Sequence, residues 1–190
     1  EAIVAPSEII KYFGEDAVIA KECEIAYNAT FMALLWDAVA TKNAKLLSQG
    51  IKSLPVKLDR ATWLNYARCH DDIGWGLNDN ILKAMGFSPE AHKQYLISFY
   101  KGDHSFSHSR GELYEFNPET LDARNSGSLA SLAGLEMALE NHDLYQQELA
   151  TKRILLIHAQ LMAESGIALI YSGDEIATVN DYSYKKKKKK

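Results

Sequence analysis

The segment Ala61-Thr-Trp-Leu-Asn-Tyr-Ala-Arg-Cys-His-Asp-Asp-Ile-Gly-Trp75 decides how the fold of this chain is interpreted. Its first seven residues form an apolar run that is typical of a strand, and the run delivers His70, Asp71 and Asp72 onto a turn. In a parallel α/β barrel, groups at the carboxyl ends of the strands converge on one cavity. The segment therefore predicts a functional site directly after a strand. The same spacing also fits residues that merely cap a strand or begin a helix.

Apolar periodicity on both sides of this segment predicts strands that alternate with helices. Two further strands are expected over 21–27, where polar and apolar residues alternate, and over 167–171, which is wholly apolar. Helical spacing extends over 7–13, 29–47, 90–100, 129–139 and 144–163, and residues 80–85 precede a break at 86–89. Strands separated by long helices predict a parallel sheet that helices cover. The Gly-, Ser-, His- and Asn-rich residues 101–127 are expected to form a long functional connection.

Polar groups follow each expected strand. They are Asn28 after the first, His70-Asp71-Asp72 after the second, and Gly173-Asp174-Glu175 after the third. This repetition favours a site at one edge of the sheet, although Asp174 and Glu175 also fit a plain helix cap. Three strands cannot close an eight-stranded barrel, so a barrel requires further sequence, chiefly before Glu1.

Composition indicates an ordinary globular protein with one domain. The chain has 190 residues, of which 47% are hydrophobic, and a formal net charge of −4. Six of its 21 basic residues form the run Lys185–Lys190, and without them 15 basic residues face 25 acidic ones. An acidic body is a poor candidate for nucleic-acid binding. We expect the acidic body, residues 1–184, to form one domain and 185–190 to be a disordered or unassigned tail.

Neither a disulfide framework nor a metal centre is expected. Cys23 and Cys69 lack the spacing of a zinc site, and a reducing compartment is the simpler interpretation. His104 and His108 are four residues apart, but they lie in a loop-like stretch without an evident third ligand. No segment resembles a signal peptide or a membrane span, so a cytoplasmic location is expected, with secretion left open.

Four segments together resemble glycoside hydrolase family 13, the α-amylase superfamily, and most closely its amylosucrase branch. They are Glu1-Ala-Ile-Val-Ala-Pro6, His70-Asp-Asp-Ile-Gly-Trp75, Phe116–Gly127 and Leu169-Ile-Tyr-Ser-Gly-Asp-Glu175. The resemblance runs from residue 1 to about residue 181, and Ala168 departs from it where the family commonly has proline. It implies that residues 1–184 are a partial catalytic domain with an α/β fold, the C-terminal half of a (β/α)8 TIM barrel, approximately strands 5 to 8 with their helices.

The resemblance also implies a role for individual residues. Glu1 would be the general acid/base, Asp71 would stabilise the transition state, and His70 would bind the glucosyl ring. Asp72 and Arg124 would together hold the fructosyl unit. The nucleophilic aspartate of the family would lie before Glu1, so this chain alone is expected to be inactive. No cofactor and no metal is implied, and the partners would be sucrose and an α-glucan or another small carbohydrate.

The implied reaction is retaining transfer of glucose from sucrose to an α-glucan, with release of fructose. Alternatives stay open: a sucrose or α-glucoside hydrolase or phosphorylase, a metal-dependent phosphohydrolase built on His70-Asp71, and a noncatalytic carbohydrate-binding or structural piece. Single residues also have plainer interpretations. Glu1 fits an exposed acid, Arg124 a surface ion pair, and Trp75 and Tyr27 fit partly buried core as well as sugar-stacking platforms.

Overall fold

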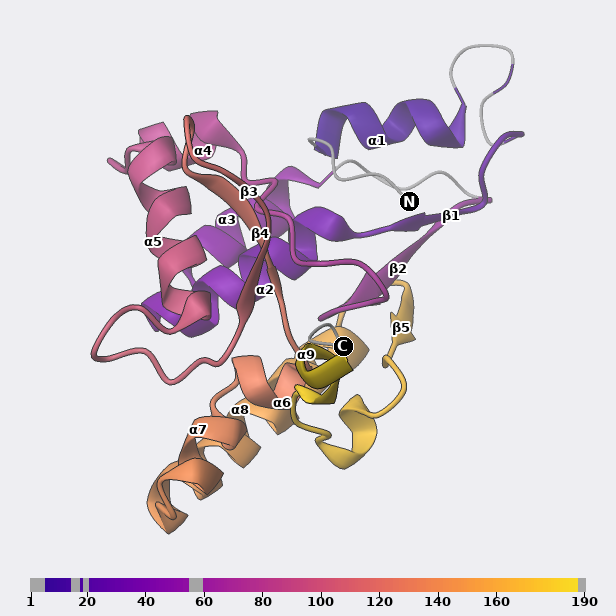
Figure 1. The fold of residues 1–190 in the computed structure, drawn as a ribbon. Helices are drawn as coiled ribbons and strands as arrows, with labels where there is room; N and C mark the ends of the chain where they lie inside the picture. The colour runs from indigo at the N-terminus through magenta and orange to yellow at the C-terminus, as the bar shows by residue number, and fades with distance from the viewer. Residues whose placement is uncertain (1–5, 15–17, 19–20, 55–59, 188–190) are drawn as a thin grey trace.

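A three-stranded parallel sheet organises the protein (Figure 1). A computed structural model describes residues 6–14, 18, 21–54 and 60–187. The strands are β1 (Ile25–Tyr27), β2 (Thr62–Tyr66) and β5 (Ile167–Leu169), in the order β1-β2-β5. Ala26 pairs with Trp63, and Asn65 pairs with Ala168. The fold is thus mixed α/β, and each predicted strand is present but shorter than expected.

Two helices, rather than the one predicted over 29–47, follow β1. Asn28 caps α2 (Ala29–Thr41) by accepting a hydrogen bond from the Phe31 N–H at 3.2 Å. Lys42 then adopts a left-handed conformation, with φ of 54°, which ends α2. The next helix, α3 (Lys45–Ser53), packs back against α2. The prediction of one continuous helix was therefore wrong, because apolar periodicity continues across a break in the backbone.

Five helices described by the structure lie between β2 and β5 in the chain. They are α4 (Asp79–Ala84), α5 (Pro89–Lys101), α6 (Leu129–Leu132), α7 (Leu135–Glu140) and α8 (Leu144–Ala163). Ser88 caps α5 with Pro89 in its first turn, and Gly102 ends it with φ of 91°. Gly134, with φ of 102°, divides the predicted helix 129–139 into α6 and α7. The helix α8 has the predicted bounds.

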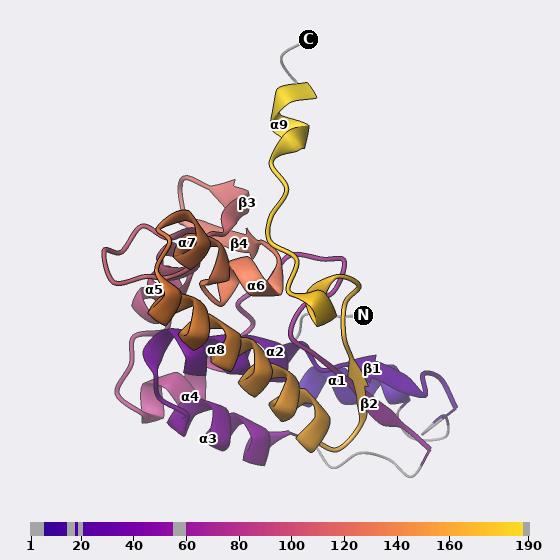
Figure 2. The same ribbon diagram turned by 90° about the horizontal axis from the view of Figure 1, so that it is seen from below.

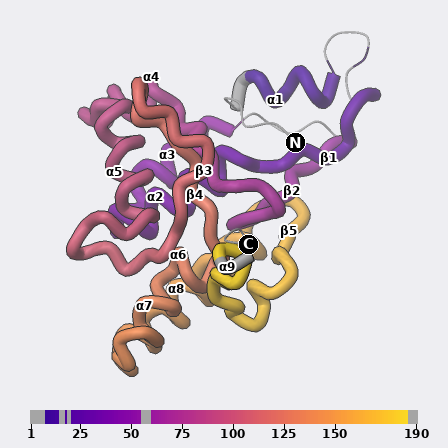
Figure 3. The backbone as a smooth tube through the Cα atoms, in the orientation of Figure 1, coloured from indigo at the N-terminus to yellow at the C-terminus, as the bar shows by residue number. Residues whose placement is uncertain are grey.

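Residues 101–127 are not the irregular connection that their composition predicts. They contain an antiparallel hairpin of β3 (Glu112–Asn117) and β4 (Asp122–Ser126). The hairpin packs against α5, as Figure 3 shows. Its register shifts between Tyr114 and Asn117, where Glu115 takes a positive φ of 52°. The turn and bulge residues gave the segment a loop-like composition, although 11 of its 27 residues are strand.

Helices cover both faces of the parallel sheet. On one face, α1 (Pro6–Phe13) packs its Phe13 ring edge-on against Trp63, with ring centroids 5.4 Å apart. Side chains alternate along a strand, so Tyr66 points to the other face. There it joins the main core with Trp36, Tyr100 and side chains of α2, α5, α6 and α8. The two faces therefore carry separate hydrophobic clusters.

A buried asparagine ties the three strands together. Asn65, with no exposed surface, accepts a hydrogen bond from the Asn28 side chain at 2.9 Å. It also donates to the Ser165 carbonyl, just before β5, at 3.2 Å. Because each buried polar group of this network has a partner, the network fixes the relative positions of the strand ends.

The chain ends beyond β5 with a short 3-10 helix, η2 (Asp174–Ile176), and α9 (Ser183–Lys187). Figure 2 shows α9 projecting away from the rest of the molecule. Lys185 in α9 is paired with Glu112 of β3. The first lysines of the terminal run are thus helical, while residues 188–190 lie outside the described part. Whether 185–190 forms a separate segment stays a prediction.

Candidate functional site

The polar residues after β2 lie on the exposed turn that the sequence predicts. No helix begins at His70 or Asp71, because the chain leaves β2 as a bend. Their side chains are 64% and 47% exposed, and His70 Nε2 lies 3.8 Å from Asp71 Oδ2. The two groups are thus open to a ligand and close enough to act on the same one. The structure excludes the helix-start alternative for this pair.

Asp72 and Arg124, the expected fructosyl-binding pair, are brought near each other by a strand-like contact. Ile73 and Asn125 form an antiparallel bridge, with backbone N–H···O distances of 2.8 and 3.1 Å. Both bridge residues are buried, whereas their chain neighbours Asp72 and Arg124 are partly exposed.

Arg124 is held by a different acid in this structure. Its Nε lies 3.5 Å from Glu115 Oε2, and the two side chains are 43% and 57% exposed. An ion pair this exposed contributes little to stability, so little free energy would be lost on exchanging one carboxylate for another. The prediction that Arg124 pairs with a surface carboxylate is confirmed, and its role in sugar binding stays a prediction.

Asn125 is the buried anchor of this region, and sequence reasoning missed it. Its side-chain oxygen accepts from Trp75 Nε1 at 2.8 Å, and its side-chain nitrogen donates to the Ile97 carbonyl at 3.1 Å. Trp75 is only 6% exposed and stacks on Tyr100, with centroids 5.4 Å apart. Trp75 is therefore core, which excludes the stacking-platform interpretation. The role of Asn125 depends on partners that are distant in the sequence, so no local signal could have identified it.

A buried ion pair connects the end of β2 to the segment after β5. Arg68 Nε donates to both oxygens of Asp174, at 3.1 and 3.0 Å, and Asp174 is 3% exposed. The Arg68 guanidinium also lies 4.3 Å from the centre of the Tyr171 ring. Burial raises the pKa of Asp174, whereas Arg68 and the hydrogen bond from the Leu129 N–H oppose that rise. One interpretation made Asp174 a plain helix cap. These contacts show that it does more than cap a local turn.

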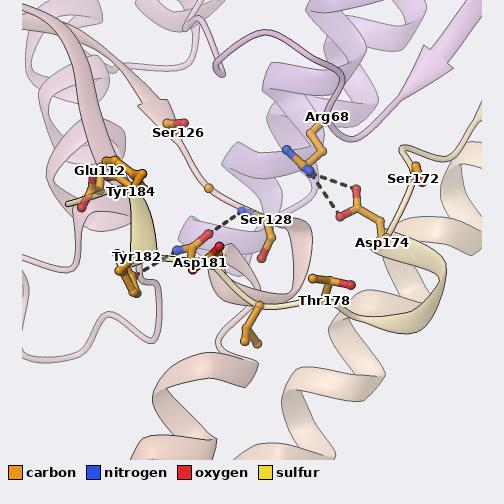
Figure 4. A pocket seen from close by; sticks show the side chains of 14 residues that line it. Arg68, Glu112, Ser126, Ser128, Ser172, Asp174, Thr178, Asp181, Tyr182 and Tyr184 are labelled. Carbon is orange, nitrogen blue, oxygen red and sulfur yellow. Dashed lines mark hydrogen bonds and ion pairs between the residues drawn. The ribbon is translucent and has the colours of Figure 1, made fainter. Parts of the chain in front are cut away.

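The Arg68–Asp174 pair lies at the wall of a polar cavity of about 320 Å³ (Figure 4). Other walls come from Ser126 and Ser128 at the end of β4 and from residues near Asn180. The Asn180 side chain accepts from the Ser128 N–H at 2.8 Å and donates to the Arg110 carbonyl at 2.6 Å. Hydroxyl and carboxamide groups of this kind suit a polyhydroxylated ligand. His70, Asp71, Asp72 and Arg124 do not line this cavity.

Three other residues singled out by the sequence are Glu1, His104 and His108. Glu1, the expected acid/base, lies outside the described residues. His104 bonds to the Ser98 hydroxyl at 2.8 Å, whereas His108 is buried and its Nε2 has no hydrogen-bond partner in the described chain. Within the described residues, no cluster of three or more His, Cys, Asp or Glu is placed to hold a metal ion.

Over the described residues, none of the helices is both long enough and apolar enough to cross a membrane. A search against models of known protein families finds none that matches this chain.

Proposed function

We propose that this chain is part of a retaining α-glucosyl transferase that takes glucose from sucrose, in the manner of the amylosucrases. In this proposal it supplies strands 5 to 8 of a (β/α)8 barrel, and β1, β2 and β5 are the last three of them. Their parallel pairing in chain order agrees with that assignment.

The observation that carries the proposal is the pairing of two segments that the resemblance selects independently. The His70–Trp75 segment and the Phe116–Gly127 segment are far apart in the chain, yet the Ile73–Asn125 bridge joins them. Asp72 and Arg124 are partly exposed neighbours of the bridge residues, and the exposed turn before the bridge carries His70 and Asp71. In this proposal, all four groups bind one sucrose molecule beside that turn.

The chemistry assigned to these groups follows from their charges. A developing oxocarbenium ion carries positive charge, and the Asp71 carboxylate would stabilise it. His70 would donate a hydrogen bond to the glucosyl ring. Asp72 would bind fructosyl hydroxyls, and Arg124 would exchange its contact with Glu115 for one with the sugar or with Asp72. Glu1 would protonate the leaving oxygen. The nucleophile would be supplied by residues outside this chain, and its carboxyl group would lie about 5 to 5.5 Å from that of Glu1, across the sugar.

Complementation tests this proposal. The 190-residue chain is mixed with a polypeptide that carries the first four βα units of a sucrose-acting family 13 enzyme, and fructose release from sucrose is measured. We expect release from the mixture and none from the chain alone. Asp71→Asn should lower the release at least a hundredfold, since it removes the stabilising charge. Asp103→Asn, which removes an exposed acid paired with Lys101, is the matched control and should not change the release.

Two results would contradict the proposal. One is fructose release that does not depend on Asp71, and the other is a properly assembled mixture that binds sucrose without cleaving it. The second result would favour the noncatalytic carbohydrate-binding function instead. An α-glucoside hydrolase would be recognised by equal release of free glucose and fructose.

A further inference from the structure

A second cavity lies in the helical layer, remote from the strand ends. It has a volume of about 340 Å³ and lies where α2, α3, α4 and α5 meet. Cavities of this size are large enough for a small organic ligand. None of the residues assigned to carbohydrate above lines it. The cavity therefore needs an explanation of its own.

A buried acid and histidine lie in the wall of this cavity. Asp37 of α2 and His92 of α5 are joined by a hydrogen bond of 2.6 Å between Oδ1 and Nε2. Their side chains are only 2% and 7% exposed. A carboxylate that is removed from water must be compensated by partners of opposite charge or by hydrogen bonds. Apart from His92, the lining contains no basic residue, as no lysine or arginine contributes to it.

The negative charge of Asp37 acts on the aromatic residues that line the cavity. Burial raises the pKa of the Tyr95 phenol, and the Asp37 charge raises it further. The Phe87 ring lies 4.9 Å from the His92 ring, and the Tyr95 ring lies 6.3 Å from it on α5. Leu46 and Met85 supply aliphatic surface. The cavity thus combines one acid, several aromatic rings and an apolar lining.

We propose that this cavity binds a small organic ammonium ion with an apolar body. His92 occupies Oδ1 of Asp37, and the ligand's ammonium group would donate a charge-assisted hydrogen bond to Oδ2. The rings of Phe87 and Tyr95 attract a cation through their faces. Leu46 and Met85 would cover the apolar body of the ligand. An anionic ligand is disfavoured, because it would meet the Asp37 charge in a site of low dielectric constant.

This inference does not depend on the proposed glucosyl transfer. The two sites share no residue, and the ammonium site involves α2 to α5 rather than the ends of the strands. A chain that fails to act on sucrose could still bind an amine here, and the reverse also holds.

The inference is tested by titrating the 190-residue chain with benzylamine. Binding is measured by calorimetry and by NMR of the aromatic side chains. Benzyl alcohol, which has the same ring and no charge, is the comparison ligand. We expect benzylamine to bind at least about tenfold more tightly than benzyl alcohol, as a charge-assisted hydrogen bond predicts. Asp37→Asn keeps an acceptor for His92 and should remove this preference.

Two further variants make the result interpretable. Glu148→Gln removes an acid that is 63% exposed on α8, and it should leave benzylamine binding unchanged. Phe87 is 40% exposed, so Phe87→Ala should fold even if Asp37→Asn does not, and it should weaken benzylamine binding severalfold.

Equal affinity for the two ligands, or benzylamine binding that survives both Asp37→Asn and Phe87→Ala, would overturn the proposal. So would resonance shifts confined to residues outside the cavity. In each of these cases the Asp37–His92 pair would serve only to hold α2 against α5.

Discussion

At the scale of single residues, His108 is an unusual group. It is 7% exposed, its Nε2 has no hydrogen-bond partner among the described residues, and its ring lies edge-on to Phe99 at 5.3 Å. Burial, with the positive charges of Arg153 and Lys42, lowers its pKa to about 3. The folded protein therefore keeps His108 neutral at pH values where the unfolded chain protonates it.

This difference predicts how stability depends on pH. In the unfolded chain, His108 binds a proton near pH 6.5. The contribution of neutral His108 to the free energy of unfolding is therefore fully present above that pH, and it is lost as the pH falls toward 3. Between pH 7.5 and pH 5, His108 should cost about 2 kcal/mol of unfolding free energy. His108→Leu should remove this part of the pH dependence, as measured by urea unfolding at both pH values.

The exposed His142 provides the control for that experiment. It has a positive φ of 52°, so His142→Asn suits its backbone and should leave the pH dependence as it is in the parent chain. If His108→Leu and the parent lose equal stability between the two pH values, then folding does not lower the pKa of His108.

Sequence alone identified part of the candidate site at this scale. His70 and Asp71 could be found because an apolar strand followed by polar residues is a local pattern. Asn125 and the Arg68–Asp174 pair could not, because their function depends on contacts between residues 50 and 106 positions apart. Nothing in the residues around Asn125 distinguishes an anchor of the core from an ordinary turn asparagine.

At the scale of elements, the break between α2 and α3 makes a second prediction. Lys42 is left-handed, a conformation that costs a residue with a Cβ about 1 kcal/mol. Lys42→Gly should therefore stabilise the protein by roughly 0.5 kcal/mol, after allowance for the greater freedom of glycine when unfolded. Thermal and urea unfolding measure the difference.

Lys52, within α3, is the matched site for this comparison. Lys52→Gly places glycine at an exposed helical position and should destabilise the protein by about 0.5 to 1 kcal/mol. If both substitutions destabilise equally, α2 continues through Lys42 as one helix, as its apolar periodicity suggested.

Elements were predicted best where a cap and an apolar face coincide. The bounds of α8 follow from Asp143, which accepts from the Gln146 N–H at 3.0 Å, and from a run of helical residues. The β3–β4 hairpin was missed because most side chains of β3 are exposed and the buried positions of β4 hold Ala123 and Asn125, so neither strand shows a clear apolar alternation. The backbone pairing of the two strands defines the hairpin.

At the scale of the whole molecule, the exposed apolar surface of α8 is the feature with the clearest consequence. Leu155 and Leu156 are 62% and 58% exposed, and Ile176 beyond β5 is 76% exposed. Within the described sheet, β5 is an edge strand whose Ile167 is 46% exposed. Apolar side chains beside an unpaired strand edge favour association with another polypeptide.

We therefore expect the 190-residue chain to self-associate as its concentration rises. A double substitution, Leu155→Lys with Leu156→Lys, should shift the sedimentation velocity distribution toward the monomer. Leu121→Lys, which changes a residue of similar exposure in the β3–β4 turn, should not. Identical monomeric sedimentation of all three proteins would show that this surface does not drive association.

The overall fold was predicted only in part. The sequence indicated parallel strands in chain order with helices between them, because each of those elements has its own periodicity. It did not indicate that α1 packs on the face opposite α2 and α8, which depends on how Trp63 and Phe13 meet. The half-barrel assignment stays a proposal for that reason.

The position of α1 has an optical consequence. In a closed barrel the helices lie outside, so the face of Trp63 that now contacts Phe13 would turn inward, and α1 would have to leave it. The other two indoles, Trp36 and Trp75, are anchored in the main core and would keep their surroundings. The fluorescence emission spectrum of Trp63 would therefore report whether the barrel is complete, without an added label, in any mixture that assembles.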